Sequence, residues 1–351
     1  MRNPSVGMGE AYMAEEIDLD GVIQQFCRLG FELKGGLIKP SLMESAKIMW
    51  GYLSRRNTLS GSRKNIAAHY DLGNEFYSLW LDQAAMQYTC AYYEKPTDTI
   101  EQAQLQKIDL VCRKLRFEPG QTVVEAGCGW GGFALHAAKN YGVKMRSYNI
   151  SKEQIAFATE RARSMGLGPD QVEYVHDDYR TIGQDGRKYE KIVSIGMLEH
   201  VGVENYKNLY KIIEEAVIPG GLALVHSIAR IAPQVTDPWL EKYIFPGSLM
   251  PSLSEMVTPV EDPDRDLHVV DVENLRYHYA LTLDAWVERL EANADKIRSE
   301  YSEAFYRMFR LYLHAAAGGF RWGGILLYQM LLSNGYDNSG EHMTRRHFFA
   351  G

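Results

Sequence analysis

Between residues 120 and 228, short apolar runs alternate with segments of helical periodicity. The runs lie at 122–126, 144–149, 172–175, 190–195 and 221–228. Runs of this length that are separated by helical segments are typical of βαβ units, in which consecutive strands lie parallel in one sheet. The alternation therefore predicts an α/β fold whose mainly parallel sheet is flanked by helices.

The first run ends in Glu125 and a glycine-rich turn, so that residues 124–132 read Val-Glu-Ala-Gly-Cys-Gly-Trp-Gly-Gly. Glycines after a strand expose backbone N–H groups and let a ligand approach the main chain closely. The spacing is Gly-x-Gly-x-Gly, without the Gly-x-Gly-x-x-Gly pattern and downstream acid of NAD proteins, which favours S-adenosylmethionine. A plain tight turn is the alternative, but the strand before it and the helix after it weigh against that alternative.

The ends of the first two strands supply candidate cofactor-binding residues, since ligands of open α/β sheets bind at the carboxyl ends of strands. Gly127 and Gly129 are expected beside the methionine part of the cofactor. The second strand ends in Asn149, Ile150 and Ser151. Many methyltransferases place a carboxylate here for the ribose. Because that carboxylate is absent, Asn149 or Gln154 has to supply the hydrogen bonds.

The third strand is followed by Asp-Asp-Tyr-Arg at 177–180. A carboxylate beside a planar aromatic ring suits an adenine pocket, so Asp178 and Tyr179 join the candidate cofactor-binding residues. A solvated turn is the alternative that these residues leave open.

Candidate catalytic residues follow the fourth and fifth runs. Glu199 comes after the fourth run and His226 ends the fifth. Adjacent parallel strands would bring both side chains to the edge of the sheet where the cofactor binds. Tyr279 lies just after a proline-rich stretch. Each of these residues alone is more often structural, but the convergence of Glu199 and His226 indicates a reaction site.

Composition narrows the classes of protein that this chain can be. Its 351 residues carry a formal net charge of −7, whereas nucleic-acid-binding proteins are usually basic. Four cysteines without CxxC spacing suggest neither a metal site nor a disulfide framework, and a reducing cytoplasm is the simplest location. We find no signal peptide and no apolar run of about 18 residues, the length of a transmembrane helix.

The chain divides into a helical N-terminal region, 1–65, and a second domain, 66–351. A helix is expected at about 99–115. Prolines crowd residues 229–282, which we interpret as an irregular lid over the open end of the sheet. Two helices are expected within 283–317, and a closing strand within 324–332.

With these segments, the chain resembles the cyclopropane-fatty-acyl-phospholipid synthase family, which includes the mycolic acid cyclopropane synthases. The resemblance covers residues 67 to about 335. The matching segments are HYDLGN at 69–74, QYTCAYYE at 87–94, EAGCGWGG at 125–132, ISKEQ at 150–154, DDYR at 177–180, GMLEHVG at 196–202, HSI at 226–228 and HYALTL at 278–283.

The resemblance implies a Rossmann-like class I methyltransferase with a seven-stranded sheet. It also implies transfer of a methylene group from S-adenosylmethionine to the cis double bond of an unsaturated acyl chain. Family members hold a bicarbonate ion as proton acceptor, and its matching ligands are Cys90, Glu199, His226, Ile228 and Tyr279. We interpret Cys90 as a ligand of this anion and not as a nucleophile. The QYTCAYYE match adds Tyr88 and Thr89 to the cofactor-binding residues.

The same resemblance gives expectations for partners and location. Phospholipid acyl chains at the membrane surface are the first choice of substrate, and a chain on a carrier protein is the second. The protein would be cytoplasmic and peripheral at the inner membrane surface, and it could form a homodimer. Basic residues at 55–64 and 344–349 could meet anionic headgroups, or could be ordinary solvated surface.

Three other functions stay open at this stage. The first is a methyl- or methylene-branched product made on the same olefin. The second is an amine N-methyltransferase of the coclaurine type, which shares several of the motifs. The third is a lipid- or cofactor-binding protein without catalysis, although the intact glycines, Glu199 and His226 argue against it.

Overall fold

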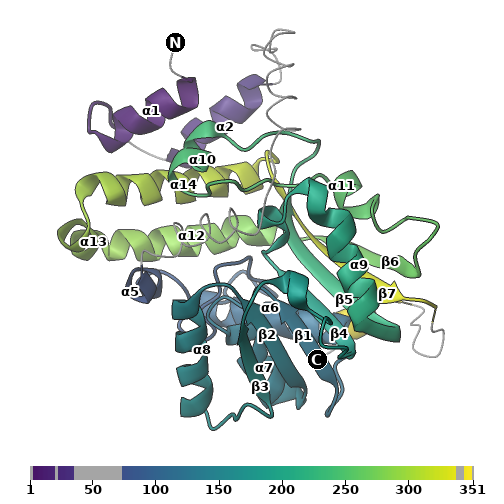
Figure 1. Cartoon of the computed structure of the whole chain (residues 1–351). Coiled ribbons are helices and arrows are strands. Elements are labelled where there is room, and N and C mark those ends of the chain that lie inside the picture. The colour runs from purple at the N-terminus through teal and green to yellow at the C-terminus, as the bar shows by residue number, and fades with distance from the viewer. Residues whose placement is uncertain (1–2, 20–22, 35–72, 337–343, 350–351) are drawn as a thin grey trace.

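The computed structural model describes residues 3–19, 23–34, 73–336 and 344–349. Its centre is a seven-stranded sheet in the order β3-β2-β1-β4-β5-β7-β6 (Figure 1). The strands are β1 (Thr122–Ala126), β2 (Lys144–Asn149), β3 (Val172–His176), β4 (Tyr189–Ile195), β5 (Val217–Ala229), β6 (Leu267–Asn274) and β7 (Leu326–Asn334). β1 to β5 pair in parallel, and β7 runs antiparallel to both β5 and β6. The five predicted apolar runs correspond to β1 to β5 and the predicted closing strand to β7, whereas β6 lies within the predicted lid.

Helices cover both faces of the sheet, so the sheet separates two main clusters of buried side chains. Side chains alternate along each strand, so Val123 joins one buried cluster and Val124 joins the other. The flanking helices are α6 (Ile100–Lys114), α7 (Gly132–Tyr141), α8 (Lys152–Ser164) and α9 (Tyr206–Ala216). α6 matches the predicted helix. Its start is fixed by a capping box of Thr99 and Gln102.

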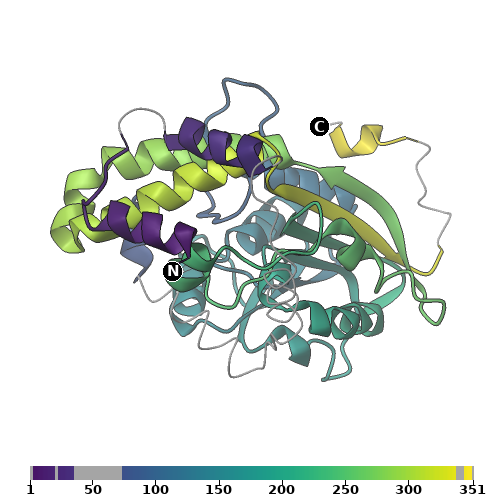
Figure 2. The ribbon, with the colours of Figure 1, turned by 90° about the horizontal axis from the view of Figure 1, so that it is seen from above.

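A second group of helices stacks beside the carboxyl end of the sheet. It consists of α12 (Arg276–Ala292), α13 (Ala294–Glu300) and α14 (Glu303–Arg321), against which α1 (Pro4–Met13) and α2 (Ile23–Lys34) lie (Figure 2). Arg307 on α14 ties the N-terminal segment down, since its guanidinium donates to the carbonyl oxygens of Tyr12, at 2.5 Å, and Ile17, at 2.9 Å. The N-terminal helices are therefore bonded to the helical layer that faces the site.

Two expectations about the second half of the chain are wrong in part. The lid predicted at 229–282 is irregular only to residue 266, where it carries the short helices α10 (Pro238–Tyr243) and α11 (Leu253–Val257). β6 and the start of α12 follow, because the prolines end at Pro263 and the segment after them pairs with β7. Three helices, not two, then occupy 276–321.

Other expectations have different outcomes. The domain boundary at 65/66, residues 69–72 of the HYDLGN segment and the basic residues at 55–64 lie outside the described residues. The short α15 (Arg346–Phe349) packs on α6, where Arg113 Nε donates to the Phe348 carbonyl oxygen at 2.6 Å. No helix in the described ranges combines the length and apolar character of a membrane span.

Candidate active site

Two adjoining cavities open at the carboxyl ends of the parallel strands. The glycine-turn cavity lies among the turn after β1, the end of β2 and residues 86–89. The apolar cavity has a volume of about 530 Å³ and is lined mostly by apolar side chains of α1, β5, α10, α12 and α14. Both cavities are lined by Tyr88, Thr89, Gly196 and His200. A group bound in one cavity therefore meets the other at these residues.

The glycine-rich turn needs glycine for two different reasons. Gly127 adopts φ 86°, in the left-handed region, and its N–H donates to the Tyr148 carbonyl oxygen at 3.0 Å. A Cβ at Gly132 would lie 1.9 Å from the Ala85 carbonyl oxygen, so any side chain there would push that segment away. The close approach is what brings Tyr88 and Thr89 to the same cavity as the turn.

The end of β2 and the first turn of α8 carry the two residues that the sequence offers for the ribose, Asn149 and Gln154. Asn149 is fully engaged, because its Nδ2 donates to Gln154 Oε1 at 2.8 Å and to the Gly129 carbonyl oxygen, and its Oδ1 accepts from the Ser151 N–H. Gln154 Nε2 is buried and has no hydrogen-bond partner within the described residues. A buried polar group without a partner fits a ligand hydroxyl such as that of a ribose. Of the two residues that the sequence offers, the geometry favours Gln154.

Four predicted cofactor residues do not line the glycine-turn cavity: Ile150, Ser151, Asp178 and Tyr179. Ser151 caps α8 by accepting the Gln154 N–H. Asp178 accepts the Arg180 N–H at 3.0 Å and forms an ion pair with the Arg180 guanidinium. These bonds give Ser151 and Asp178 a local structural role, so direct contact of these four residues with the cofactor stays a prediction.

Glu125 lies on the wall of the glycine-turn cavity at the end of β1. It is buried and accepts a hydrogen bond from Ser147 Oγ at 2.8 Å. Burial raises the pKa of its carboxyl to about 7, because the charged form loses its hydration. Burial therefore favours the protonated form of this carboxyl well above its ordinary pH range.

The sequence analysis missed a lysine behind this wall. Lys107 on α6 is completely buried, and its Nζ donates to Gln87 Oε1 at 2.8 Å and Thr89 Oγ1 at 2.9 Å. Burial lowers the pKa of Lys107 to about 8. A signal was present, since Lys107 falls on the same helical stripe as the apolar residues Ile100 and Val111.

Glu199 and Ile228 both line the apolar cavity, and a hydrogen bond joins them. The Ile228 N–H donates to Glu199 Oε1 at 2.7 Å, whereas Glu199 Oε2 is buried and has no hydrogen-bond partner in the described part of the chain. Burial raises the pKa of Glu199 to about 7. His226 and Ile228 lie two residues apart on β5, so their side chains point to the same face of the sheet. Glu199 is bonded to the backbone of this segment.

His226 is the second polar group of this cluster. Its Nδ1 lies 3.2 Å from Gln329 Nε2, while its Nε2 is buried and has no hydrogen-bond partner among the described residues. Burial holds the pKa of His226 well below its usual range, so the ring is neutral at pH 7. Unpartnered polar atoms on both Glu199 and His226 fit a small polar ligand between them.

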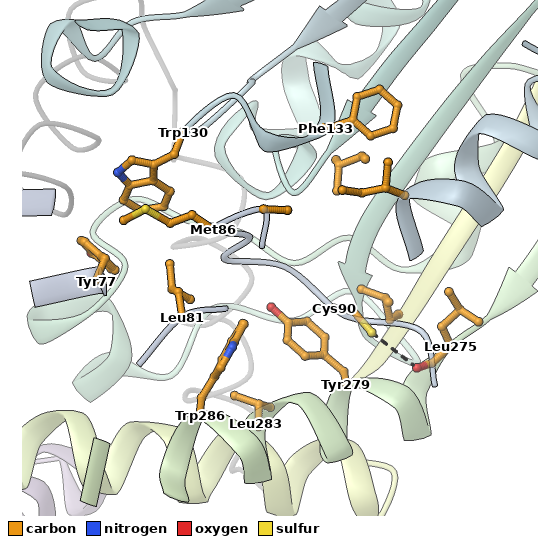
Figure 3. Close-up of a cluster of buried hydrophobic side chains, with 14 of the residues drawn as sticks. Tyr77, Leu81, Met86, Cys90, Trp130, Phe133, Leu275, Tyr279, Leu283 and Trp286 are labelled. Atoms are coloured by element: carbon orange, nitrogen blue, oxygen red, sulfur yellow. Dashed lines mark hydrogen bonds between the residues drawn. The ribbon is translucent and has the colours of Figure 1, made fainter. Parts of the chain in front are cut away.

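Tyr279 and Cys90 have different positions, although both are buried. Tyr279 on α12 lines the apolar cavity and stacks on Phe320, with ring centroids 4.3 Å apart. Cys90 lines neither cavity, and its Sγ donates to the carbonyl oxygens of Ala91, at 3.1 Å, and Leu275, at 3.9 Å (Figure 3). Burial raises the pKa of the Cys90 thiol, which argues against a nucleophilic thiolate. Its role as an anion ligand stays a prediction.

His200, which directly follows Glu199 in the sequence, was not singled out in advance. Its position in both cavity walls places it at their junction. Burial lowers the pKa of His200 to about 4, so this ring is also neutral. Tyr88 lies at the same junction, and its hydroxyl donates to the Tyr312 hydroxyl at 3.0 Å. The junction is thus aromatic and uncharged, which suits transfer between a polar cofactor and an apolar acceptor.

Comparison with known proteins agrees with this geometry. The profile of the family described as "Mycolic acid cyclopropane synthetase" matches residues 57–330. A probable fatty acid methyltransferase of Pseudomonas putida is 37% identical, over 95% of this chain and 84% of its own length. The cyclopropane-fatty-acyl-phospholipid synthase of Escherichia coli strain K12 is 35% identical, over 96% of this chain and 85% of its own.

Among solved structures, the mycolic acid cyclopropane synthase CmaA1 complexed with SAH and CTAB aligns with a TM-score of 0.71 and 29% identity. The alignment covers 77% of this chain and 98% of that one. The family profile, the curated relatives and the fold thus agree on S-adenosylmethionine as the cofactor, and the cavity beside the glycine-rich turn is its predicted site. The chain belongs to the mycolic acid cyclopropane synthetase family of S-adenosylmethionine-dependent methyltransferases.

Proposed function

We propose that this enzyme transfers a methylene group from S-adenosylmethionine to the cis double bond of an unsaturated acyl chain of a membrane phospholipid, with bicarbonate as proton acceptor. One observation carries the proposal. The large apolar cavity adjoins the glycine-turn cavity, and its mostly apolar wall carries Glu199 and His226, each with a buried atom that has no hydrogen-bond partner among the described residues. The name of the Escherichia coli relative supports the same product and substrate.

The chemistry divides between the bound groups and the protein. Bound S-adenosylmethionine would supply an electrophilic methyl group. Its transfer to the alkene would break the S–CH₃ bond, release S-adenosylhomocysteine and leave the positive charge on the acyl chain. A bicarbonate held by Glu199 and His226 would accept the proton lost from the added methyl group, and the electron pair of that C–H bond would close the ring. The protein has to align the reactants and keep out water, which would trap the cation as an alcohol.

The residues of the apolar cavity fit those two tasks. Tyr88, Phe245 and Tyr279 present aromatic rings to the cavity, and aromatic faces stabilise positive charge. Burial holds the pKa of His226 well below its usual range and raises the pKa of Glu199 to about 7, so it disfavours the charged form of both groups, and a neutral wall attracts less water. Their unpartnered atoms provide hydrogen bonds that hold the small anion.

A cationic side chain supports a phospholipid as the substrate. Arg230 lines the apolar cavity, and its Nε is buried without a hydrogen-bond partner in the described ranges. The next residue, Ile231, has 76% of its surface exposed, so the cavity wall and the protein surface meet at this point. An arginine beside an exposed apolar residue fits a lipid phosphate at the membrane surface.

The tail contributes less to membrane binding than its sequence suggests. Arg345 forms an ion pair with Asp271, and Phe348 is buried. We propose a peripheral location at the inner face of the cytoplasmic membrane, with Arg230 as the contact for the headgroup. A homodimer remains part of the proposal and is tested by sedimentation equilibrium.

The first experiment incubates the protein with S-adenosylmethionine, bicarbonate and vesicles of dioleoyl phosphatidylglycerol, followed by gas chromatography and mass spectrometry of the released acyl chains. A gain of one CH₂ with loss of the double bond and a cyclopropane fragmentation pattern is the expected result. A methyl- or methylene-branched chain of related mass would contradict ring formation. That second outcome has support in the name of the Pseudomonas putida relative, a probable fatty acid methyltransferase.

The phospholipid part is tested separately with Arg230→Gln. We expect the KM for phosphatidylglycerol vesicles to rise by about tenfold, the loss typical of one charge-assisted hydrogen bond, with kcat little changed. Arg187→Gln, an exposed arginine that lines neither cavity, serves as the control. An unchanged KM in the Arg230 variant would point to another acyl donor, such as a carrier-bound chain.

A further inference from the structure

Three side chains form a row across the sheet beneath the apolar cavity. The register of the strands places His226 on β5 opposite Gln329 on β7, and Gln329 opposite Glu273 on β6. Side chains of directly opposed residues lie on the same face of a sheet, so the three neighbour one another. Lys114, near the end of α6, completes the group from the helix layer on that face.

Hydrogen bonds connect this group into a chain. Lys114 Nζ pairs with the Glu273 carboxylate and donates to Gln329 Oε1 at 2.7 Å. Gln329 Nε2 in turn lies 3.2 Å from His226 Nδ1. Lys114, Gln329 and His226 are each at most 1% exposed, so water does not compete for these bonds.

The direction of the chain is fixed at its lysine end. An ammonium group has three donors and no acceptor, so the Gln329 atom that faces Lys114 has to be the carbonyl oxygen. The amide NH₂ of Gln329 therefore faces His226 and donates to Nδ1. A nitrogen that accepts a hydrogen bond carries no proton, and the proton of the neutral His226 ring consequently sits on Nε2.

We infer that Lys114 and Gln329 are positioning residues that hold His226 as its Nε2–H tautomer, with this N–H aimed at the anion beside Glu199. The inference rests on the proposed function for the identity of the anion, but not for the tautomer. His226 Nε2 is buried and unpartnered in the described part of the chain, on the cavity that Glu199 also lines. A fixed donor there binds an anion without a rearrangement during the reaction.

The tautomer is measured directly by nitrogen NMR of the full chain labelled with ¹⁵N at histidine, without lipid, cofactor or added bicarbonate. His226→Asn identifies the signals by their loss. We expect the wild type to show an unprotonated Nδ1 and a protonated Nε2 on His226, and Lys114→Met to show a mixture of both tautomers. A proton on Nδ1 in the wild type, or a single unchanged tautomer in Lys114→Met, would overturn the inference.

Kinetics then test whether the tautomer matters for turnover, measured as S-adenosylhomocysteine release whatever the lipid product. We expect Lys114→Met and Gln329→Met to lower kcat by about tenfold to a hundredfold, as for loss of a hydrogen bond to a charged group, with unchanged S-adenosylmethionine affinity. Lys114→Arg, which keeps a cationic donor, should restore most of the activity. If it does not, or if both methionine variants keep full kcat, the positioning role is wrong.

A matched control separates positioning from ordinary loss of stability. Asn334 is another buried amide on β7, whose Nδ2 donates to the Val217 carbonyl oxygen at 2.8 Å, and it lines neither cavity. Asn334→Ala should lower stability but leave both the His226 signals and kcat unchanged. If Asn334→Ala lowers kcat as much as Lys114→Met does, the effect is structural and the inference fails. A non-cyclopropane product would contradict the proposed function alone.

Discussion

The two cavities differ in how far apart in the sequence their walls lie. The glycine-turn cavity takes about half of its lining from one stretch, residues 125 to 154, and the rest from two short segments at 86–89 and 195–200. The apolar cavity combines α1 near one end of the chain with β5, α12 and α14 hundreds of residues later. The cofactor cavity therefore has one local motif at its centre, whereas the acceptor cavity depends on long-range packing throughout.

The largest expected effect tests whether the apolar cavity can fail by itself. Glu199→Gln keeps the size of the side chain but removes its charge and its ability to exchange a proton. We expect kcat to fall by about a thousandfold, the scale of a lost acid–base or electrostatic group. Turnover is measured by S-adenosylhomocysteine release, and cofactor affinity by isothermal titration.

Cofactor affinity should be unchanged in Glu199→Gln, because Glu199 lines only the apolar cavity. Glu204→Gln, an exposed carboxylate of the following turn, is the control. Equal losses of cofactor affinity and kcat in Glu199→Gln would show that the two cavities do not function separately.

The reverse test impairs the glycine-turn cavity alone. Gln154→Leu removes the buried, unpartnered Nε2 and also the hydrogen bond from Asn149. We expect S-adenosylmethionine to bind about tenfold more weakly, the usual loss for one hydrogen bond, while kcat at saturating cofactor changes little. Gln171→Leu, at an exposed position, controls for the added leucine. An unaltered Kd would return the ribose contact to Asn149.

A pH experiment addresses two buried carboxyls: Glu125, which lines the glycine-turn cavity, and Glu199, which lines the apolar cavity. Burial raises each pKa from 4.5 to about 7, so the native state holds a proton that the unfolded chain has already released in this range. The stability that these protonated groups contribute is present below pH 4.5 and is lost as the pH rises through 7. Glu125→Gln should remove the Glu125 part of this loss.

We expect the Glu125→Gln variant to gain about 1–3 kcal/mol in unfolding free energy relative to the wild type between pH 5 and pH 8. Urea denaturation at both pH values measures this difference, since glutamine can still accept the bond from Ser147 Oγ. Glu118→Gln, at an exposed position, provides the reference. A pH-independent difference would mean that Glu125 titrates in its ordinary range.

The smallest effect is expected at Cys90, which the sequence places in the catalytic set but whose side chain lines neither cavity. Serine can still donate to the Ala91 carbonyl oxygen, so Cys90→Ser should lose less than about tenfold in kcat, the size of one altered hydrogen bond. Steady-state kinetics with intact cofactor binding provide the measurement. A completely inactive variant with normal cofactor affinity would instead make the thiol itself an essential group.

The sequence allowed the sheet and part of the site to be predicted, because the signals are local. A strand, its glycine turn and the next helix are consecutive in the chain, so Glu125, Gly127 and Gly129 are recognisable as one motif. Glu199 and His226 were predictable because parallel strands end at one edge of the sheet. The lid boundary was wrong because proline content was extended past Pro263 into β6, which is held by pairing with β7.

Residues that act through distant partners could not be predicted in this way. Lys107 lies on the apolar stripe of its helix, but only the packing of α6 shows that Lys107 and Lys114 are buried against residues of the site. Contacts between separate segments also set three other features: the hydrogen bonds of Asn149, the direction of the Cys90 thiol and the row from Glu273 to His226.

Local patterns in the sequence were enough to predict the class of fold and the cofactor and to name candidate reactive groups, because side-chain chemistry and strand–turn–helix geometry are encoded locally. The tertiary structure shows which of those groups line a cavity and which buried polar atoms lack a partner among the described residues, and it carries our inference about the proton of His226. Burial and cross-strand register set these properties, and both arise from residues that are far apart in the chain.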